Sequence, residues 1–193
     1  VEALSKNNVI INNYEGVYEY VWELNRKEVV LLDKKKVNYA IYKSLDSNIE
    51  VIDKINPTTL LKAVKNPIEL DNLRKSHIKD GVAVTKFMYW LKTNVNKIKI
   101  TEISASDYLE GLRKEQEGYI ELSFDTISAY QEHAAMMHYS ATEESDSELK
   151  AEGLLLVDSG GQYFEGSTDI TRTFVLGPIE DEWKKHYTLV TKS

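Results

Sequence analysis

Hydrophobic positions in the first 56 residues alternate between short continuous runs and helical spacing. The continuous runs predict strands, and apolar residues that recur every three or four positions predict helices. The order strand, helix, strand, helix, strand is typical of an α/β unit with parallel strands. The predicted elements are strands at 9–11, 29–32 and 49–55 and helices at 14–24 and 37–45.

A break in this pattern follows at Asn56-Pro57-Thr58-Thr59. Proline disfavours helix at the residue before it, so this stretch is a candidate boundary between two regions. We therefore divide the chain into a first domain of residues 1–60 and a second domain of residues 61–193. The mixture of elements in both predicts an α/β (α+β) fold class.

The second region opens with a strong helix start. Asn66 can cap the helix, a proline occupies the first helical position, and Glu69 can complete a capping box. Apolar residues at helical spacing extend this helix to about Thr93. A second helix is predicted after Thr101, and a third around residues 183–190.

Four strands are predicted between the last two helices. Residues 120–124 alternate, as in a strand with one covered face. Residues 136–140 form a candidate strand with His138 on one of its faces. Residues 154–157 form a continuous apolar run, as expected of a strand covered on both faces. Residues 168–175 alternate and are rich in Thr, Ile and Val, which favours an antiparallel return strand.

The last two strands bring two carboxylates together. Asp158 ends the apolar run and Asp169 begins the return strand, with turn-forming glycines between them. Two carboxylates 4 Å apart repel by about 4 kcal/mol at an effective dielectric near 20. A fold that places them together therefore favours a shared metal ion or a shared proton. Oxygen ligands suit divalent ions such as Mn, Co or Zn.

The two aspartates, and two further candidate residues, His138 and Arg172, also have simpler interpretations. Asp-Ser-Gly-Gly is an ordinary turn sequence, and Thr-Asp is an ordinary strand cap. His138 could be a structural histidine, and Arg172 could either hold a carboxylate near the metals or face solvent. His133 lies in a predicted loop and receives no role. The acidic stretch 143–152 is predicted to be a solvated connection.

Composition excludes several classes of function. The net charge of -7 argues against nucleic-acid binding through a basic surface. There is no cysteine, so neither disulfides nor thiolate chemistry is available. No apolar run has membrane-spanning length and no signal peptide is recognisable, so we expect a cytoplasmic protein without membrane contact.

The two aspartate segments resemble the signature of the pita-bread metallopeptidases, family M24, which includes aminopeptidase P, prolidase and methionine aminopeptidase. The Gln-Tyr after the glycines is more similar to the three-domain aminopeptidase P branch than to prolidase. Further segments upstream match in the order of the family. The matching segments are 62–67, 77–80, 122–128, 137–139, 158–163 and 166–173.

The resemblance implies a fold, a site and a substrate. The first domain would be the C-terminal part of a creatinase/prolidase N-terminal-like α/β domain, and the second would be the first half of a pita-bread catalytic domain. Asp158 and Asp169 would hold two divalent ions, most commonly Mn2+, with Co2+ or Zn2+ as alternatives. His138 would contact the substrate beside the scissile bond. The substrates would be peptides with proline at the second position.

The resemblance also implies an incomplete site. The three other metal ligands of the family, one histidine and two glutamates, lie downstream of the last residue here. We therefore expect this chain to be a fragment of an Xaa-Pro aminopeptidase that binds metal weakly and has no peptidase activity by itself. A half domain would expose strand edges and apolar surface, so we expect a homodimer or other self-association. The alternatives are prolidase and a non-catalytic, peptidase-like binding module.

Overall fold

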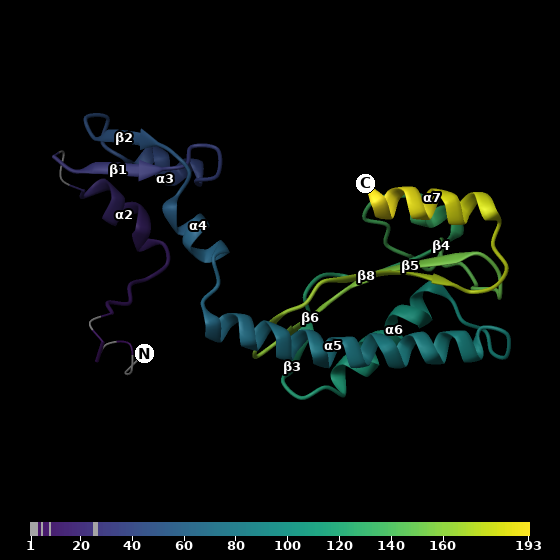
Figure 1. Cartoon of the computed structure of the whole chain (residues 1–193). Helices are drawn as coiled ribbons and strands as arrows, with labels where there is room; N and C mark the ends of the chain where they lie inside the picture. Colours follow the sequence, from purple (N-terminus) through teal and green to yellow (C-terminus); the bar gives the residue numbers. More distant parts are fainter. Residues whose placement is uncertain (1–3, 5, 8, 25–26) are drawn as a thin grey trace. The chain divides into compact units, whose positions relative to one another are not determined.

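The computed structural model describes residues 4, 6–7, 9–24 and 27–193. They belong to two compact units, Val1–Lys65 and Asn66–Ser193 (Figure 1). The sequence placed the boundary between residues 60 and 61, and helix α4 (Pro57–Ala63) spans this point. Within the described ranges, no helix combines the length and the apolar character that crossing a membrane requires.

The first unit contains a small α/β arrangement. Strands β1 (Val29–Leu32) and β2 (Glu50–Asp53) pair in parallel, as the predicted order of elements requires. Helix α2 (Gly16–Trp22) precedes β1, and α3 (Tyr39–Ser44) connects the two strands.

The strand predicted at residues 9–11 is wrong. Its backbone belongs to no described strand, and its three apolar side chains are exposed, with Ile10 84% accessible. A short apolar run forms a strand only where another strand completes its hydrogen bonds. The predicted boundary at Pro57 is also the start of α4, because the Asn56 side chain accepts a hydrogen bond from the Thr58 amide.

The second unit begins with two helices that contact each other. Helix α5 (Pro67–Asn94) begins with the predicted capping box, in which Asn66 and Glu69 exchange hydrogen bonds. Helix α6 (Glu102–Lys114) begins after Thr101, as predicted, and the Thr101 side chain accepts from the Ser104 amide. Helix α7 (Asp181–Lys192) confirms the third predicted helix.

The strands of this unit form two three-stranded antiparallel sheets. One has the order β4 (Ile127–Tyr130), β5 (Leu154–Ser159), β8 (Ile170–Val175). The other has the order β3 (Tyr119–Leu122), β6 (Gly161–Tyr163), β7 (Gly166–Ser167). Figure 1 shows α5 and α6 on one side of β5 and β8, and α7 on the other.

Strand β5 is covered more completely on one face than on the other. Leu155, Val157 and Ser159 are buried and the intervening residues are half-buried, so both faces are covered, as predicted, but to different extents. The buried face packs on α5 and α6, and α7 covers only part of the other face. The hydrophobic core comprises Ala83, Phe87, Leu91, Val95, Ile100, Ala105, Leu109, Leu112, Tyr130, Leu149, Leu155, Val157, Phe174 and Leu176.

The connection between β4 and β5 begins with a 3-10 helix, η1 (Gln131–Ala135). Its later part, predicted to be a solvated link, is tied to the core instead. Leu149 is buried, and its amide donates to the Ile100 carbonyl oxygen at 2.8 Å. Glu143 and Glu144 are exposed, as their charge requires.

Candidate functional site

Asp158 is the fifth residue of the central strand β5. Its partners in the sheet are Ile127 on β4 and Thr171 on β8. Carboxylate oxygen Oδ1 accepts a hydrogen bond from the Thr171 hydroxyl at 2.7 Å. Because side chains alternate along a strand, Asp158 lies on the face opposite the buried Val157 and Ser159. The carboxylate therefore lies on the sheet face that does not pack on α5 and α6.

Asp169 immediately precedes β8 and is exposed. The predicted antiparallel return strand is confirmed, but it begins at Ile170. The register pairs Ser159 with Ile170 and Asp158 with Thr171, so Asp169 lies two residues before the partner of Asp158. The chain between the two strands forms the β6–β7 hairpin, which joins the other sheet.

Gly160 allows the two aspartate segments to approach each other closely. A Cβ atom at this position would collide with the Thr168 carbonyl oxygen and the Ser123 hydroxyl. The Ser123 hydroxyl donates to that same carbonyl oxygen at 2.9 Å. No larger residue therefore fits between the chain after Asp158 and the chain before Asp169.

A fully buried ion pair lies beneath these segments. Arg113 Nε donates to Asp80 Oδ1 at 2.5 Å, and neither side chain has exposed surface. Arg113 Nη2 also donates to the Ser159 hydroxyl at 3.0 Å. Asp80 Oδ2 accepts from the Thr168 hydroxyl at 2.7 Å. Because Ser159 follows Asp158 and Thr168 precedes Asp169, one network holds the neighbours of both candidate ligands.

Tyr163 completes this network. Its hydroxyl donates to Asp80 Oδ1 at 3.2 Å. Burial raises the pKa of the Tyr163 phenol, and the adjacent Asp80 carboxylate raises it further. The phenol therefore remains a hydrogen-bond donor over the whole physiological pH range.

His138 lies in a turn, and the strand predicted for residues 136–140 is wrong. The Tyr139 amide donates to the Met136 carbonyl oxygen at 3.3 Å, which closes the turn with His138 as its third residue. The φ angle of His138 is 57°, in the left-handed region. This region costs a residue with a Cβ atom about 1–2 kcal/mol. Such conformations in residues other than glycine concentrate at functional sites.

The turn belongs to the connection that leaves the sheet beside β5. Strand β4 ends at Tyr130, which lies opposite Leu155, whereas Ile127 lies opposite Asp158. The connection that carries His138 thus begins three residues, roughly 10 Å, along β5 from Asp158. Asp158 thus lies on the central strand of this sheet, Asp169 directly before its edge strand β8, and His138 in the connection that follows β4.

Arg172 is on the wrong face to hold Asp158. It lies opposite Val157 in the ladder and lines a hollow with residues of α5, including Gly81 and Met88. Thr171, which no motif singled out, is the residue that donates a hydrogen bond to Asp158. The sequence feature that indicates this contact is the strict alternation of residues 168–175, which puts every second side chain on the sheet face of the Asp158 carboxylate.

The two aspartates have the character that a cation site needs. Neither forms an ion pair with any basic side chain that the structure describes. Among the described residues, no group of three or more His, Asp or Glu side chains is gathered closely enough to hold a metal ion. Two carboxylates without a basic partner offer the donor atoms and the negative charge that part of a metal site would need.

Two family models match the chain. Residues 1–69 match the creatinase/prolidase N-terminal domain, and residues 71–193 match metallopeptidase family M24. Similar proteins include a probable Xaa-Pro aminopeptidase P of Botryotinia fuckeliana, 34% identical over 98% of this chain and 30% of its own length. The aminopeptidase P1 of Arabidopsis thaliana is 36% identical over 93% of this chain and 31% of its own length.

Solved structures agree with these matches. The X-prolyl aminopeptidase of Caenorhabditis elegans, described as a cytosolic enzyme with a di-nuclear active site, superposes with a TM-score of 0.89 at 34% identity. It covers 97% of this chain, which spans 32% of its length. The Xaa-Pro dipeptidase of Bacillus anthracis has the same fold, with a TM-score of 0.76 at 22% identity. The chain spans about a third of the length of the three aminopeptidases named above, and it belongs to metallopeptidase family M24.

Proposed function

We propose that this chain supplies the first part of a dinuclear metal site in an aminopeptidase that hydrolyses the bond between an N-terminal residue and a following proline. The observation that carries the proposal is the β5–β8 register, which sets Asp169 two residues from the partner of Asp158. The relatives named Xaa-Pro aminopeptidase support the choice of substrate.

The register favours a shared site for the two carboxylates. An extended backbone that continues the ladder would put Asp169 on the face of Asp158 as a diagonal neighbour, about 7 Å away. Aspartate side chains can close such a gap around a pair of ions about 3.5–4 Å apart. The Thr171 hydroxyl would fix the orientation of Asp158, as outer hydrogen bonds commonly do for carboxylate ligands.

The ions would supply Lewis-acid chemistry to the scissile carbonyl group, most commonly as Mn2+, with Co2+ or Zn2+ as alternatives. The bond before a proline is a tertiary amide without an N–H, so the site cannot recognise it by accepting a hydrogen bond from it. Recognition must use the ring and the neighbouring carbonyl groups. His138 would contact the substrate there, because its exposed imidazole can donate a hydrogen bond to a carbonyl oxygen.

The partners would be peptides with proline second, in the cytoplasm, the setting described for the C. elegans enzyme. With two of the expected ligands, the chain would bind Mn2+ weakly and would not turn over an Xaa-Pro peptide. A full-length protein that contains residues 1–193 would do both.

Calorimetric titration of this chain with Mn2+ tests the site. We expect weak binding that Asp158→Asn or Asp169→Asn abolishes. The matched control is Asp181→Asn, which makes the same change of charge in an exposed residue of α7 and should leave binding unchanged. Binding that survives both site substitutions would refute the shared site.

An assay of peptide hydrolysis tests the reaction. Robust hydrolysis by the 193-residue chain would refute the incomplete site. In a full-length protein, a preference for Xaa-Pro dipeptides over longer peptides would favour prolidase. An absence of both metal binding and hydrolysis there would favour a binding module.

A further inference from the structure

The first residue of α6, Glu102, is a glutamate without exposed surface. Its oxygen Oε1 accepts from the Tyr130 amide at 2.6 Å, and Oε2 accepts from the Ser147 amide at 3.1 Å. The Tyr139 hydroxyl donates to Oε2 at 2.8 Å. His133 Nδ1 lies 2.9 Å from Oε1 and 3.0 Å from Oε2. One carboxylate is therefore the common partner of two backbone amides and two side chains.

These partners belong to a single segment of the chain. Tyr130 and Ser147 are the residues on either side of segment 131–146, and Glu102 bonds the amide of both. The Glu102 amide in turn donates to the Ser147 carbonyl oxygen at 3.1 Å. Holding both ends of a flexible segment at one point removes much of its conformational freedom. We call residues 131–146 the His138 loop.

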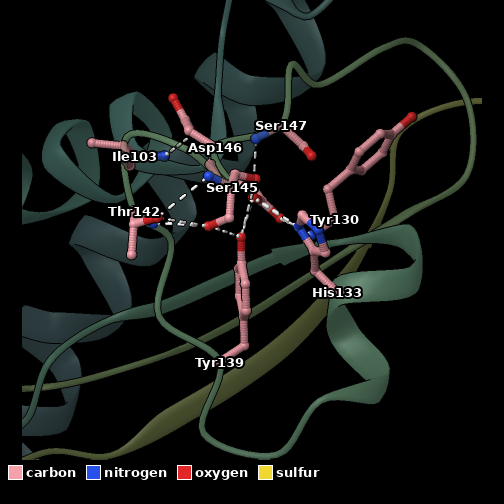
Figure 2. Close-up of polar contacts among 9 residues, drawn as sticks. Ile103, Tyr130, His133, Tyr139, Thr142, Ser145, Asp146 and Ser147 are labelled. Atoms are coloured by element: carbon pink, nitrogen blue, oxygen red, sulfur yellow. Dashed lines mark hydrogen bonds and ion pairs between the residues drawn. The ribbon is translucent and has the colours of Figure 1, made fainter.

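The side chains inside the loop converge on the same point. Figure 2 shows the ring of His133 and the hydroxyl of Tyr139 directed toward one place from two sides of the loop. The two rings stack with centroids 4.5 Å apart. Ser145 Oγ lies 3.1 Å from the Tyr139 hydroxyl and accepts from the Thr142 amide at 2.9 Å. Tyr139, which follows His138 directly, is thereby fixed at its hydroxyl end.

Glu102 is not needed to cap its own helix. The Ile103 amide donates to Asp146 Oδ1 at 3.1 Å, and the Ser104 amide donates to the Thr101 hydroxyl at 3.2 Å. The first turn of α6 thus has other acceptors. A carboxylate at this point of a helix gains from the helix dipole, but all four groups that contact the Glu102 carboxylate lie outside the helix.

We propose that Glu102 is a positioning residue for His138. By holding both ends of the His138 loop and the side chain next to His138, it maintains the left-handed conformation that presents the imidazole. This role rests on the proposed peptidase function, in which His138 would contact the substrate. Glu102 itself is buried and does not touch substrate.

Hydrogen exchange in this chain tests the holding contacts. Glu102→Gln keeps the shape but offers N–H groups to partners that already donate. We expect the amides of Tyr130 and Ser147 to exchange about 10- to 100-fold faster, since a mispaired buried donor weakens its local structure by that factor. The amides of the β5–β8 ladder should stay within about twofold of the wild-type rates.

The matched control is Glu110→Gln, the same change at a partly exposed site of α6, which should alter neither set of amides. Uniform acceleration across the whole unit would show a general loss of stability and overturn the proposal, as would unchanged exchange. Glu102→Asp, which keeps the charge on a shorter stem, should restore part of the protection. A failure to restore more than Glu102→Gln would also count against a role for the carboxylate.

Kinetics in a full-length protein that contains these residues test the link to His138. We expect Glu102→Gln and His138→Ala each to lower kcat/KM by about tenfold or more. The double variant should be no slower than His138→Ala alone, since residues that act as a unit are not additive. Additive losses would overturn the proposal. If the wild-type protein hydrolyses no Xaa-Pro peptide, the proposed function fails, and the exchange experiment alone decides whether Glu102 holds the loop.

Discussion

Neutralising Asp80 should strongly destabilise the second unit. Asp80 accepts hydrogen bonds from Arg113 Nε and Nη2, from the Tyr163 hydroxyl and from the Thr168 hydroxyl. Asp80→Asn keeps the shape but leaves the Arg113 guanidinium charged, buried and without its counter-charge. Breaking a buried pair in this way costs about 3–5 kcal/mol. A direct Coulomb estimate agrees, since unit charges 4 Å apart interact by about 4 kcal/mol at an effective dielectric near 20.

Urea unfolding followed by circular dichroism measures this cost. With a denaturant slope of about 2 kcal/mol/M, the midpoint should fall by about 2 M. The control is Asp71→Asn on α5, whose carboxylate pairs with Lys75 at 2.6 Å on the exposed side of the helix. Its midpoint should not change measurably, because surface pairs contribute little.

A double variant separates charge from packing. Asp80→Leu with Arg113→Met removes both charges and should recover part of the stability that Asp80→Asn loses, because no unpaired charge remains buried. The account is refuted if Asp80→Asn and Asp71→Asn have equal effects, or if the double variant is less stable than Asp80→Asn. The first result would mean that the buried pair does not organise the unit.

Four further outcomes can be checked. His138→Asn should leave the free energy of unfolding unchanged or raise it by up to about 1 kcal/mol, because asparagine tolerates positive φ. The same substitution should remove peptide hydrolysis by a full-length protein. A loss of stability in urea unfolding would contradict the interpretation. Gly160→Ala should destabilise by about 1–3 kcal/mol through overpacking, whereas Gly111→Ala, which has open space in α6, should not destabilise. The raised pKa of the Tyr163 phenol contributes stability that is fully present below pH 10. This stability is lost as the pH rises from 10 toward the pKa in the folded protein, because only the unfolded state then releases the proton. Tyr163→Phe should therefore reduce the fall of the urea midpoint with pH above pH 10, and an unchanged pH dependence would exclude this assignment. The chain should self-associate as its concentration rises, since large apolar side chains are exposed, among them Leu61 with 73% of its surface accessible. Light scattering measures this, and a strictly monomeric mass would contradict the expectation.

Local signals in the sequence were sufficient for helices α2, α3, α5, α6 and α7 and for strands β1, β2, β3, β5 and β8, but they missed α4, β4, β6 and β7. The capping box at Asn66 and Glu69 fixed the start of α5, and the Thr101 cap fixed the start of α6. The alternation after residue 168 correctly gave the antiparallel partner of β5. These signals act between residues close in sequence, so a pattern along the chain contains them.

The His138 turn could not be predicted in this way. Met136, His138 and Ser140 alternate as they would in a strand, and the sequence alone gives no sign of the left-handed residue. The decisive contacts come from Glu102, which is distant in sequence and bonds Tyr139 and both ends of the loop. A long-range contact of this kind overrides the local pattern.

The buried pair left a signal that could have been used. Asp80 occupies the apolar stripe of α5, between His77 and Val84 at helical spacing, where a charged residue is rare unless it is paired. Arg113 is its partner from α6. A charge on a core-facing stripe predicts that a partner exists, but the choice of Arg113 depends on how the two helices pack.

The most direct test of the central claim is a crystal structure, grown with Mn2+, of a full-length protein that contains these residues. Anomalous scattering should place manganese about 2.0–2.2 Å from carboxylate oxygens of both Asp158 and Asp169. Manganese bound to only one of the two aspartates, or only at a distant site, would contradict the shared metal site.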